Sequence, residues 1–300
     1  MNEQADAPLA VTIGNFDGVH LGHRAILERL KAHARASGAN PAVVTFDPHP
    51  QAVLRGHAPL ALVTAARRTE LLEEAGIDRV LVIPFDRSLS LVEPEAFVSE
   101  MLVRGLGVRA VVVGENFRFG HKARGDTAML AAMGRKLGFS FEAVPLRELD
   151  GRPVSSSAIR RAIADCDLAW ANRALGRHHQ VPGRIVRGKG RGVGLGFPTA
   201  NIDPPGNFCL PGLGIYAGHL IVGDERLVSA ISVGTNPTYG EHNPVTLEAY
   251  ALDFEGDLYG EEGEIEFAAH LRPEQAFPSE AELAAAIKND VAEVRRLLPS

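Results

Sequence analysis

A ten-residue run rich in glycine and histidine, Gly14 to His23, is the feature that most constrains how this chain can fold. It follows an apolar, strand-like segment at residues 9–13 and precedes a helix-like segment at residues 24–33. Glycines at such a junction permit a tight turn and a close approach of the backbone to a ligand. The helix that follows presents free N–H groups and its positive dipole end to an anion. The run therefore predicts a phosphate site after the first strand of an α/β sheet.

His20 and His23 stand three positions apart, which puts both imidazoles on one side of a helical turn. Two such donors could hold a triphosphate while it is cleaved. The alternative is a pair of surface histidines beside an ordinary turn, which the complete run disfavours. Zinc binding is also disfavoured, because the pair lacks a helical His-Glu-x-x-His frame and an obvious third ligand.

Strand-like and helix-like segments alternate from residue 9 to about residue 145. The strand-like segments are rich in Val and Ile without polar alternation, as in a parallel sheet that is buried on both faces. A doubly wound sheet of this kind binds its ligands at the carboxyl ends of the strands. The expected strands are residues 9–13, 42–46, 79–85, 109–114 and 139–145, and the expected helices are residues 64–75, 94–105 and 126–138.

Two further helices are expected at residues 158–165 and 168–175. After them the sequence pattern changes to short strand-like stretches that are interrupted by glycine and proline. Such stretches favour a closed antiparallel barrel. Its expected strands are residues 183–187, 214–221, 226–233, 245–254 and 264–271, and a terminal amphipathic helix at residues 280–298 should pack on or beside it. We therefore expect an amino-terminal domain with linker helices at residues 1–180 and a barrel domain at residues 181–300.

Composition excludes several classes of function. The net charge is −6 and no face rich in Lys and Arg is visible, which argues against nucleic acid as the main partner. The amino terminus is polar and acidic, and no apolar run reaches membrane-spanning length, so we expect a cytoplasmic protein without membrane contact. Cys166 and Cys209 are isolated, which disfavours a disulfide framework and a zinc site.

Two groups of motifs resemble known families. The first group resembles the flavin adenylyltransferase branch of the nucleotidyltransferases that carry His-x-Gly-His, and lies at residues 14–23, 45–50, 114–120, 125–126 and 154–160. The second group resembles riboflavin kinase, and lies at residues 196–201, 234–240 and 247–250. From about residue 9 to about residue 297 the chain is thus similar to the bacterial bifunctional riboflavin kinase/FAD synthetase family.

The resemblance implies two reactions: a barrel that phosphorylates riboflavin to FMN with ATP, and an amino-terminal domain that adenylylates FMN to FAD and releases pyrophosphate. It implies Mg²⁺ as the cofactor and riboflavin, FMN, FAD and ATP as the ligands. The implied catalytic residues are His20, His23 and Glu248. The implied nucleotide contacts are Gly14, Phe16, Asp17, Gly18, Ser155, Ser156, Ser157, Arg160, Lys189 and Arg191. The implied flavin contacts are Asn116, Phe117 and Arg118, and the implied metal ligands are Thr199 and Asn201.

Three of these assignments also have a basis in the residues themselves. Thr199 and Asn201 are two positions apart, so on an extended strand their oxygens face the same way, and hard oxygen ligands suit Mg²⁺. The alternative is an ordinary exit from a turn. Glu248 stands in a largely apolar stretch, and a carboxylate on the interior face of a barrel is costly unless it is used, for example as a base. A salt-bridged glutamate at the rim is the alternative.

Two segments each allow two interpretations. The serines at 155–157 cap a helix, and they also bind phosphates if that helix folds back onto the edge of the sheet. The glycine-rich segment 188–196 matches neither a dinucleotide fingerprint nor a P-loop. It is either a loop that covers phosphates with Lys189 and Arg191, or a mobile polar hairpin.

The chain departs from the family pattern at three positions. Ser157 stands where threonine is usual, Tyr250 stands where histidine is usual, and Ala249 is smaller than the usual residue. Two other functions are weighed beside the implied one. A transferase acting on another phosphorylated cofactor precursor leaves the second half of the chain unexplained, and a flavin-binding sensor conflicts with the intact His-x-Gly-His.

Overall fold

The computed structural model describes residues 8–187, 197–235 and 245–299. The chain divides into two compact units. The first unit consists of Met1–Pro59 and Thr64–Ser156, and the second consists of Leu60–Val63 and Ser157–Ser300.

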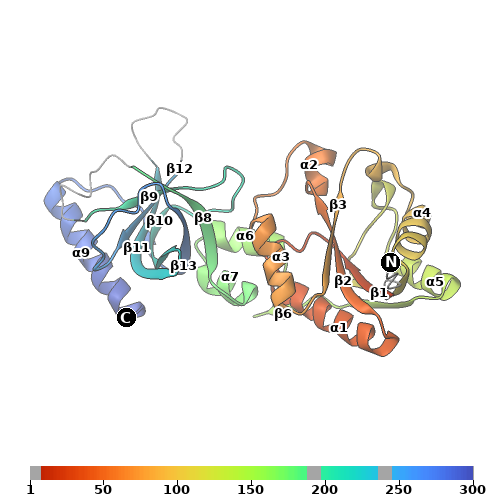
Figure 1. The fold of residues 1–300 in the computed structure, drawn as a ribbon. Coiled ribbons are helices and arrows are strands. Elements are labelled where there is room, and N and C mark those ends of the chain that lie inside the picture. Colours follow the sequence, from red (N-terminus) through yellow and green to blue (C-terminus); the bar gives the residue numbers. More distant parts are fainter. Residues whose placement is uncertain (1–7, 188–196, 236–244, 300) are drawn as a thin grey trace, which may run out of the picture. The chain divides into compact units, whose positions relative to one another are not determined.

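A five-stranded parallel sheet with the order β3-β2-β1-β4-β5 forms the first unit (Figure 1). Its strands are β1 (Leu9–Ile13), β2 (Asn40–Asp47), β3 (Arg79–Pro84), β4 (Val108–Gly114) and β5 (Ser140–Val144). All five predicted strands are confirmed, with ends that differ by one or two residues. Because β1 and β4 are neighbours, the segments that follow them meet at one edge of the sheet.

Helices connect these strands. They are α1 (Leu21–Ser37), α2 (Pro50–Arg55), α3 (Ala65–Glu74), α4 (Pro94–Ala96), the π-helix η2 (Phe97–Gly105) and α5 (Thr127–Leu137). Two single turns, η1 (Leu89–Leu91) and η3 (His121–Ala123), and a small hairpin of β6 (Glu148–Leu149) and β7 (Arg152–Pro153) complete the unit. The Thr64 and Asp126 side chains cap α3 and α5, because each accepts a hydrogen bond from a helix N–H group.

The α1 helix is longer than residues 24–33, the range that was predicted. It begins at Leu21 because the His20 side chain caps it, and it continues to Ser37, where Gly38 ends it in the left-handed conformation. Val11, Val44 and Val111 are fully buried between the helices that cover the sheet. This apolar core fixes the strand ends that carry the first candidate site.

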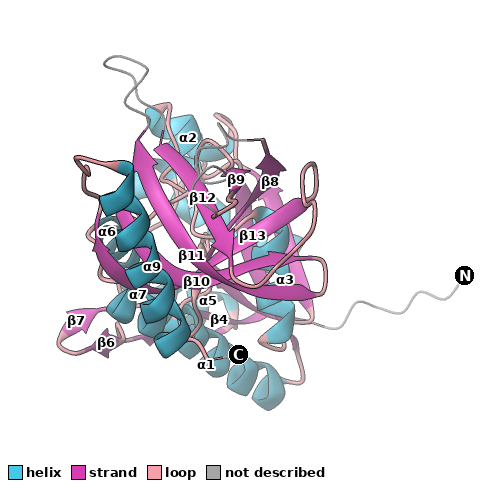
Figure 2. Cartoon of the chain, turned by 90° about the vertical axis from the view of Figure 1, so that its left-hand side faces the viewer, coloured by secondary structure: helices cyan, strands magenta, loops and turns pink. Residues whose placement is uncertain are grey.

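The second unit is a closed six-stranded barrel with the order β10-β11-β12-β9-β8-β13. Its strands are β8 (His179–Val186), β9 (Ala200–Asp203), β10 (Gly214–Val222), β11 (Glu225–Thr235), β12 (Val245–Ala251) and β13 (Glu262–Pro273). The predicted barrel is confirmed, but β9 is a strand that the sequence reading missed. The terminal helix α9 (Glu280–Leu297) packs across β10 and β11 (Figure 2).

Two helices precede the barrel, α6 (Ser156–Ala164) and α7 (Leu168–Leu175). The Asn172 side chain donates to the Phe267 carbonyl at 2.9 Å and accepts from the His179 N–H at 2.8 Å, so α7 is hydrogen-bonded to both β13 and β8. The short segment Leu60–Val63 also belongs to this unit, because Ala61 exchanges backbone hydrogen bonds with Asn207 and Cys209. The functional division near residue 180 stays a prediction.

Candidate functional site

The first candidate site lies where β1 ends and α1 begins. His20 caps α1, and its Nδ1 accepts a hydrogen bond from the His23 N–H at 3.3 Å. The two imidazole rings are stacked, with centroids 3.6 Å apart, so both face the same side as predicted. Space beside Gly22 is tight, because a Cβ at that position would lie 3.0 Å from the Val154 carbonyl oxygen and 3.1 Å from the His20 ring.

Burial sets the protonation of this pair. His20 is buried, and the Nδ1 atom of His23 is buried without a hydrogen-bond partner in the part of the chain that the structure describes. Burial, and to a smaller extent the neighbouring His20, hold the pKa of His23 well below the usual histidine value. His23 is therefore neutral at pH 7 and can donate one hydrogen bond without carrying a charge.

The loop before α1 has a contorted backbone. Phe16 (φ 50°), Gly18 (φ 85°) and Val19 (φ 38°) all lie in the left-handed region, which is unusual for phenylalanine and more so for the β-branched valine. The Ser156 hydroxyl donates to the Asp17 carbonyl at 2.9 Å, which brings the serine-rich segment against this loop. Of its neighbours, Ser155 is half-buried and Ser157 is exposed. Arg160 belongs to the second unit, where its Nε donates to the Leu60 carbonyl at 2.6 Å.

An aromatic pocket of about 410 Å³ opens at the same edge of the sheet. Its lining includes Ile13 at the end of β1, together with Phe46, Phe85, Phe97, Phe117 and Phe119. Phe117 and Phe119 are stacked with centroids 5.6 Å apart. Of the three predicted flavin residues, Phe117 and Arg118 line the pocket and Asn116 does not. The sequence reading missed the contribution of Phe85, which follows the edge strand β3.

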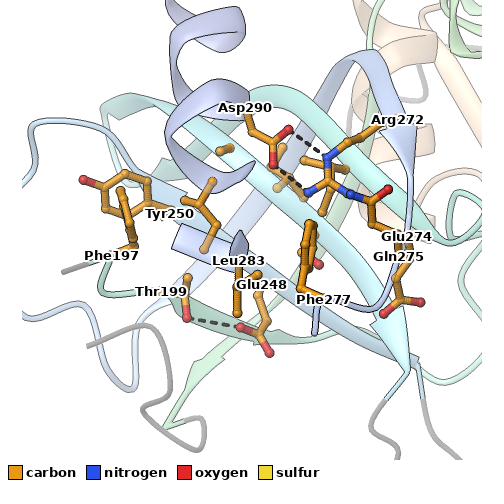
Figure 3. Close-up of a pocket in the computed structure, with 15 residues that line it drawn as sticks. Phe197, Thr199, Glu248, Tyr250, Arg272, Glu274, Gln275, Phe277, Leu283 and Asp290 are labelled. Atoms are coloured by element: carbon orange, nitrogen blue, oxygen red, sulfur yellow. Dashed lines mark hydrogen bonds and ion pairs between the residues drawn. The ribbon is translucent and has the colours of Figure 1, made fainter. Parts of the chain in front are cut away.

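A second pocket, of about 270 Å³, lies in the barrel unit between the outer wall of the barrel and α9 (Figure 3). The Thr199 hydroxyl donates to Glu248 Oε2 at 3.2 Å within it. Asn201 is paired directly with Glu248 in the β12–β9 register, so both side chains lie on the same face of the barrel. The structure thus brings Glu248 together with Thr199 and Asn201, the pair that was predicted to bind the metal.

The expectation that Glu248 faces the barrel interior is wrong. Leu247 and Ala249 are fully buried and fill the interior, whereas Glu248 alternates with them and points outward beneath α9. An apolar interior leaves no room for an unpaired carboxylate, while the outer pocket gives it a hydroxyl partner. No cation pairs with Glu248 among the residues that the structure describes, which does not favour the alternative of a salt-bridged glutamate.

The far end of this pocket contains an ion pair that sequence reading missed. Arg272 of β13 donates two hydrogen bonds to Asp290 of α9, at 2.9 and 2.8 Å, and its guanidinium lies over the Phe277 ring (Figure 3). Tyr250, the atypical residue, meets Phe197 edge-to-face with centroids 5.4 Å apart. The sequence contains one indication of this ion pair. Asp290 is a charged residue three positions after Ile287, next to the apolar stripe of the terminal helix.

The donor set around Glu248 fits a magnesium ion, since it offers hydroxyl, amide and carboxylate oxygens. Within residues 8–187, 197–235 and 245–299, no group of three or more His, Cys, Asp or Glu side chains is arranged to hold a metal. Lys189 and Arg191 lie outside the described residues, as does most of the motif at residues 234–240. Neither Cys166 nor Cys209 is in a disulfide, and none of the described helices could span a membrane.

Comparison with known proteins connects both sites to one family. The family model of FAD synthetase matches residues 2–158, and that of riboflavin kinase matches residues 175–298. The bifunctional riboflavin kinase/FMN adenylyltransferase of Pseudomonas fluorescens is 38% identical over 95% of this chain and 92% of its own length. The chain belongs to the bifunctional riboflavin kinase/FMN adenylyltransferase family. It is an enzyme that combines a riboflavin kinase with an FAD synthetase and uses ATP.

Other relatives agree along nearly the whole length. The enzyme of the same name from Listeria monocytogenes is 36% identical over 98% of this chain and 94% of its own length, and that from Escherichia coli K12 is 36% identical over 93% and 90%. A solved structure from Streptococcus pneumoniae, described as a macrolide-efflux protein, has a TM-score of 0.89 at 24% identity and covers 97% of this chain and 95% of that one. That likeness concerns the fold alone.

Proposed function

We propose that the barrel unit phosphorylates riboflavin to FMN, and that the sheet unit then adenylylates FMN to FAD, each with one ATP. The observation that supports this division is that each unit has its own pocket beside its own set of polar groups. We place adenylyl transfer in residues 1–180 and phosphorylation in residues 181–300, whereas the structural division assigns residues 157–180 to the barrel unit. We also expect the protein to be cytoplasmic.

In the kinase step, the 5′-hydroxyl oxygen of riboflavin attacks the γ-phosphorus of ATP, the bond to the bridging oxygen breaks, and ADP leaves. Glu248 accepts the hydroxyl proton. The Thr199 hydroxyl, which donates to Glu248 Oε2, orients that carboxylate. Thr199 and Asn201 would also hold Mg²⁺, which supplies neutralisation of phosphate charge when it is bound. Lys189 and Arg191 remain candidate phosphate donors.

In the adenylyl step, a phosphate oxygen of FMN attacks the α-phosphorus of a second ATP and pyrophosphate leaves. His20 and His23 stabilise the charge that develops on the phosphates, because a stacked and buried pair is held in place before the reaction begins. The residues from Gly14 to Gly18 contribute backbone donors, and Ser155, Ser156, Ser157 and Arg160 are the further phosphate contacts that we propose. No covalent enzyme intermediate is needed.

Flavin recognition rests on the two pockets. Stacked phenylalanines suit the flat, apolar isoalloxazine ring, so we assign FMN to the aromatic pocket that Phe117 and Arg118 line. Asn116 remains a predicted flavin contact, although it does not line that pocket. Riboflavin occupies the pocket between the barrel wall and α9, with its 5′-hydroxyl towards Glu248.

A turnover experiment tests the proposal. The protein is incubated with riboflavin, ATP and Mg²⁺, and flavins are separated by chromatography over time. FMN should appear before FAD, and supplied FMN should yield FAD and pyrophosphate. Flavin binding without turnover would instead identify a sensor, and preferred adenylylation of phosphopantetheine or nicotinamide mononucleotide would identify a transferase for another cofactor precursor.

A further inference from the structure

The carbonyl groups of the loop before α1 are held by donors from the surrounding structure. The Asn15 carbonyl accepts from Arg68 Nη1 at 3.2 Å and from the Thr45 hydroxyl at 3.5 Å. The Asp17 carbonyl accepts from Ser156 Oγ at 2.9 Å. These donors come from outside the loop, so the surrounding structure helps to fix its conformation.

Holding a carbonyl also aims an N–H group. In a trans peptide the C=O and N–H bonds point in opposite directions. The donors on the Asn15 carbonyl therefore turn the Phe16 N–H to the opposite side of the loop. Phe16 also adopts a left-handed φ of 50°, a strained conformation that persists only where the surroundings enforce it.

Arg68 differs from the arginine next to it in a way that suits this role. Arg67 is also on α3, but its guanidinium pairs with Glu70 and Glu74, both at 2.8 Å. Arg68 has no carboxylate partner among the described residues, and its Nε is buried without a hydrogen-bond partner there. Its positive charge is therefore not compensated by an acid and remains next to the proposed phosphate site.

We propose that Arg68 is a positioning residue for adenylyl transfer, which holds the Asn15 carbonyl and thereby aims the Phe16 N–H at the phosphates. The inference rests on the proposed function of the sheet unit. It assigns a role to a helix residue that lies 53 positions from its contact in the sequence.

The test compares Arg68→Ala and Arg68→Lys with Arg67→Ala as the matched control in the full-length enzyme. We expect Arg68→Ala to lower kcat for FAD formation from FMN by about 10²-fold, because small misplacements of a catalytic group have effects of this size. KM for ATP should change little, and Arg68→Lys should recover part of kcat because it keeps a cationic donor. Arg67→Ala should match the wild type, and riboflavin phosphorylation should be unchanged in all three.

Several results would overturn the inference. They are a normal kcat for folded Arg68→Ala, an equal loss in Arg67→Ala, or a lower melting temperature with normal turnover per folded molecule. If Arg68→Ala does not fold, Arg68→Gln takes its place in the same comparison. His20→Ala is measured in parallel: if it keeps full FAD formation, the proposed site itself is wrong, whereas loss in His20→Ala with normal Arg68 variants contradicts only the role of Arg68.

Discussion

The two candidate sites of this enzyme are built in opposite ways. The proposed adenylyltransferase site is a short continuous segment, residues 14–23, whose backbone is bent into left-handed conformations and held by donors on its carbonyls. The proposed kinase site collects side chains between residue 197 and residue 290, from several strands and from the terminal helix. One site depends on a backbone conformation, and the other depends on strand register and helix packing.

This difference determines what a substitution reveals. In the kinase pocket a single functional group can be removed while the strand that carries it stays in place. In the loop, a side chain such as that of His20 both faces the site and caps α1, so its removal also affects the local structure. The predictions below use matched controls to separate the two kinds of effect.

The largest expected effect belongs to Glu248→Gln. The substitution keeps the shape and removes the proton acceptor, so riboflavin phosphorylation should fall by about 10²–10⁴ in rate. Adenylylation of supplied FMN should stay at the level of the wild type, because it takes place in the other unit. Both activities and the melting temperature are measured on one preparation. Near-normal phosphorylation of riboflavin would exclude Glu248 from the mechanism.

His20→Ala and His23→Ala should have the next largest effect. Each should lower the rate of FAD formation by about 10²–10³, the typical cost of losing one preorganised donor. FMN formation by the same protein is the internal control and should continue. A parallel fall in both activities of a folded variant would contradict the assignment of two separate sites.

The continuous site was therefore easier to predict than the distributed one. The loop and the strand before it form one motif, and the structure stacks His20 on His23 as their spacing indicates. The sequence could not show that β9 exists, because it has only four residues. Nor could it show which face Glu248 occupies, because alternation along β12 defines two faces and only barrel closure decides which is the interior.

Contacts between distant elements were also beyond sequence reasoning. Arg272 and Asp290 meet only because α9 packs back across the barrel. Arg68 reaches Asn15 only because α3, which packs against β3, brings its side chain to the loop after β1. Periodicity predicts each of these elements separately. It contains no information about which charged residue of one element faces a given residue of another.

Asp290→Asn tests whether helix packing holds the kinase pocket together. The variant leaves the Arg272 guanidinium, which is 22% exposed, beside an uncharged partner, and the free energy of unfolding should fall by about 3 kcal/mol. KM for riboflavin should rise because α9 forms one wall of the pocket. Urea unfolding followed by the fluorescence of Trp170, the single tryptophan, reports on the barrel unit.

A matched control for this variant is available on the same helix. Asp253 pairs with Arg295 of α9 at 2.7 Å, but both side chains are exposed, so Asp253→Asn should lower the free energy of unfolding far less than Asp290→Asn does. Equal losses in the two variants would show that burial of the Arg272 pair contributes nothing. Normal KM for riboflavin in Asp290→Asn would show that α9 does not shape the pocket.

The smallest expected effect is a pH dependence of the free energy of unfolding of the barrel unit. His179 is fully buried, its Nε2 contacts the Cys209 carbonyl at 2.8 Å, and its Nδ1 has no hydrogen-bond partner among the described residues. Burial lowers the pKa of His179 to about 4, from the usual 6.5. The unfolded chain therefore binds a proton that the folded chain excludes, and the free energy of unfolding should decrease as the pH falls from 6.5 towards 4. The slope should reach at most about 1.4 kcal/mol per pH unit.

Urea unfolding followed by Trp170 fluorescence at several pH values measures this slope for the wild type, His179→Gln and His57→Gln. The glutamine at position 179 cannot titrate, so its curve should be flatter than that of the wild type between pH 6.5 and 4, even if the variant is less stable throughout. His57 is exposed and lies in the sheet unit, so its replacement should leave the slope unchanged. Equal slopes in all three proteins would show that protonation of His179 is not what destabilises the barrel unit at low pH. A change with His57→Gln would show that the fluorescence of Trp170 also reports on the sheet unit, and that the two units do not unfold independently.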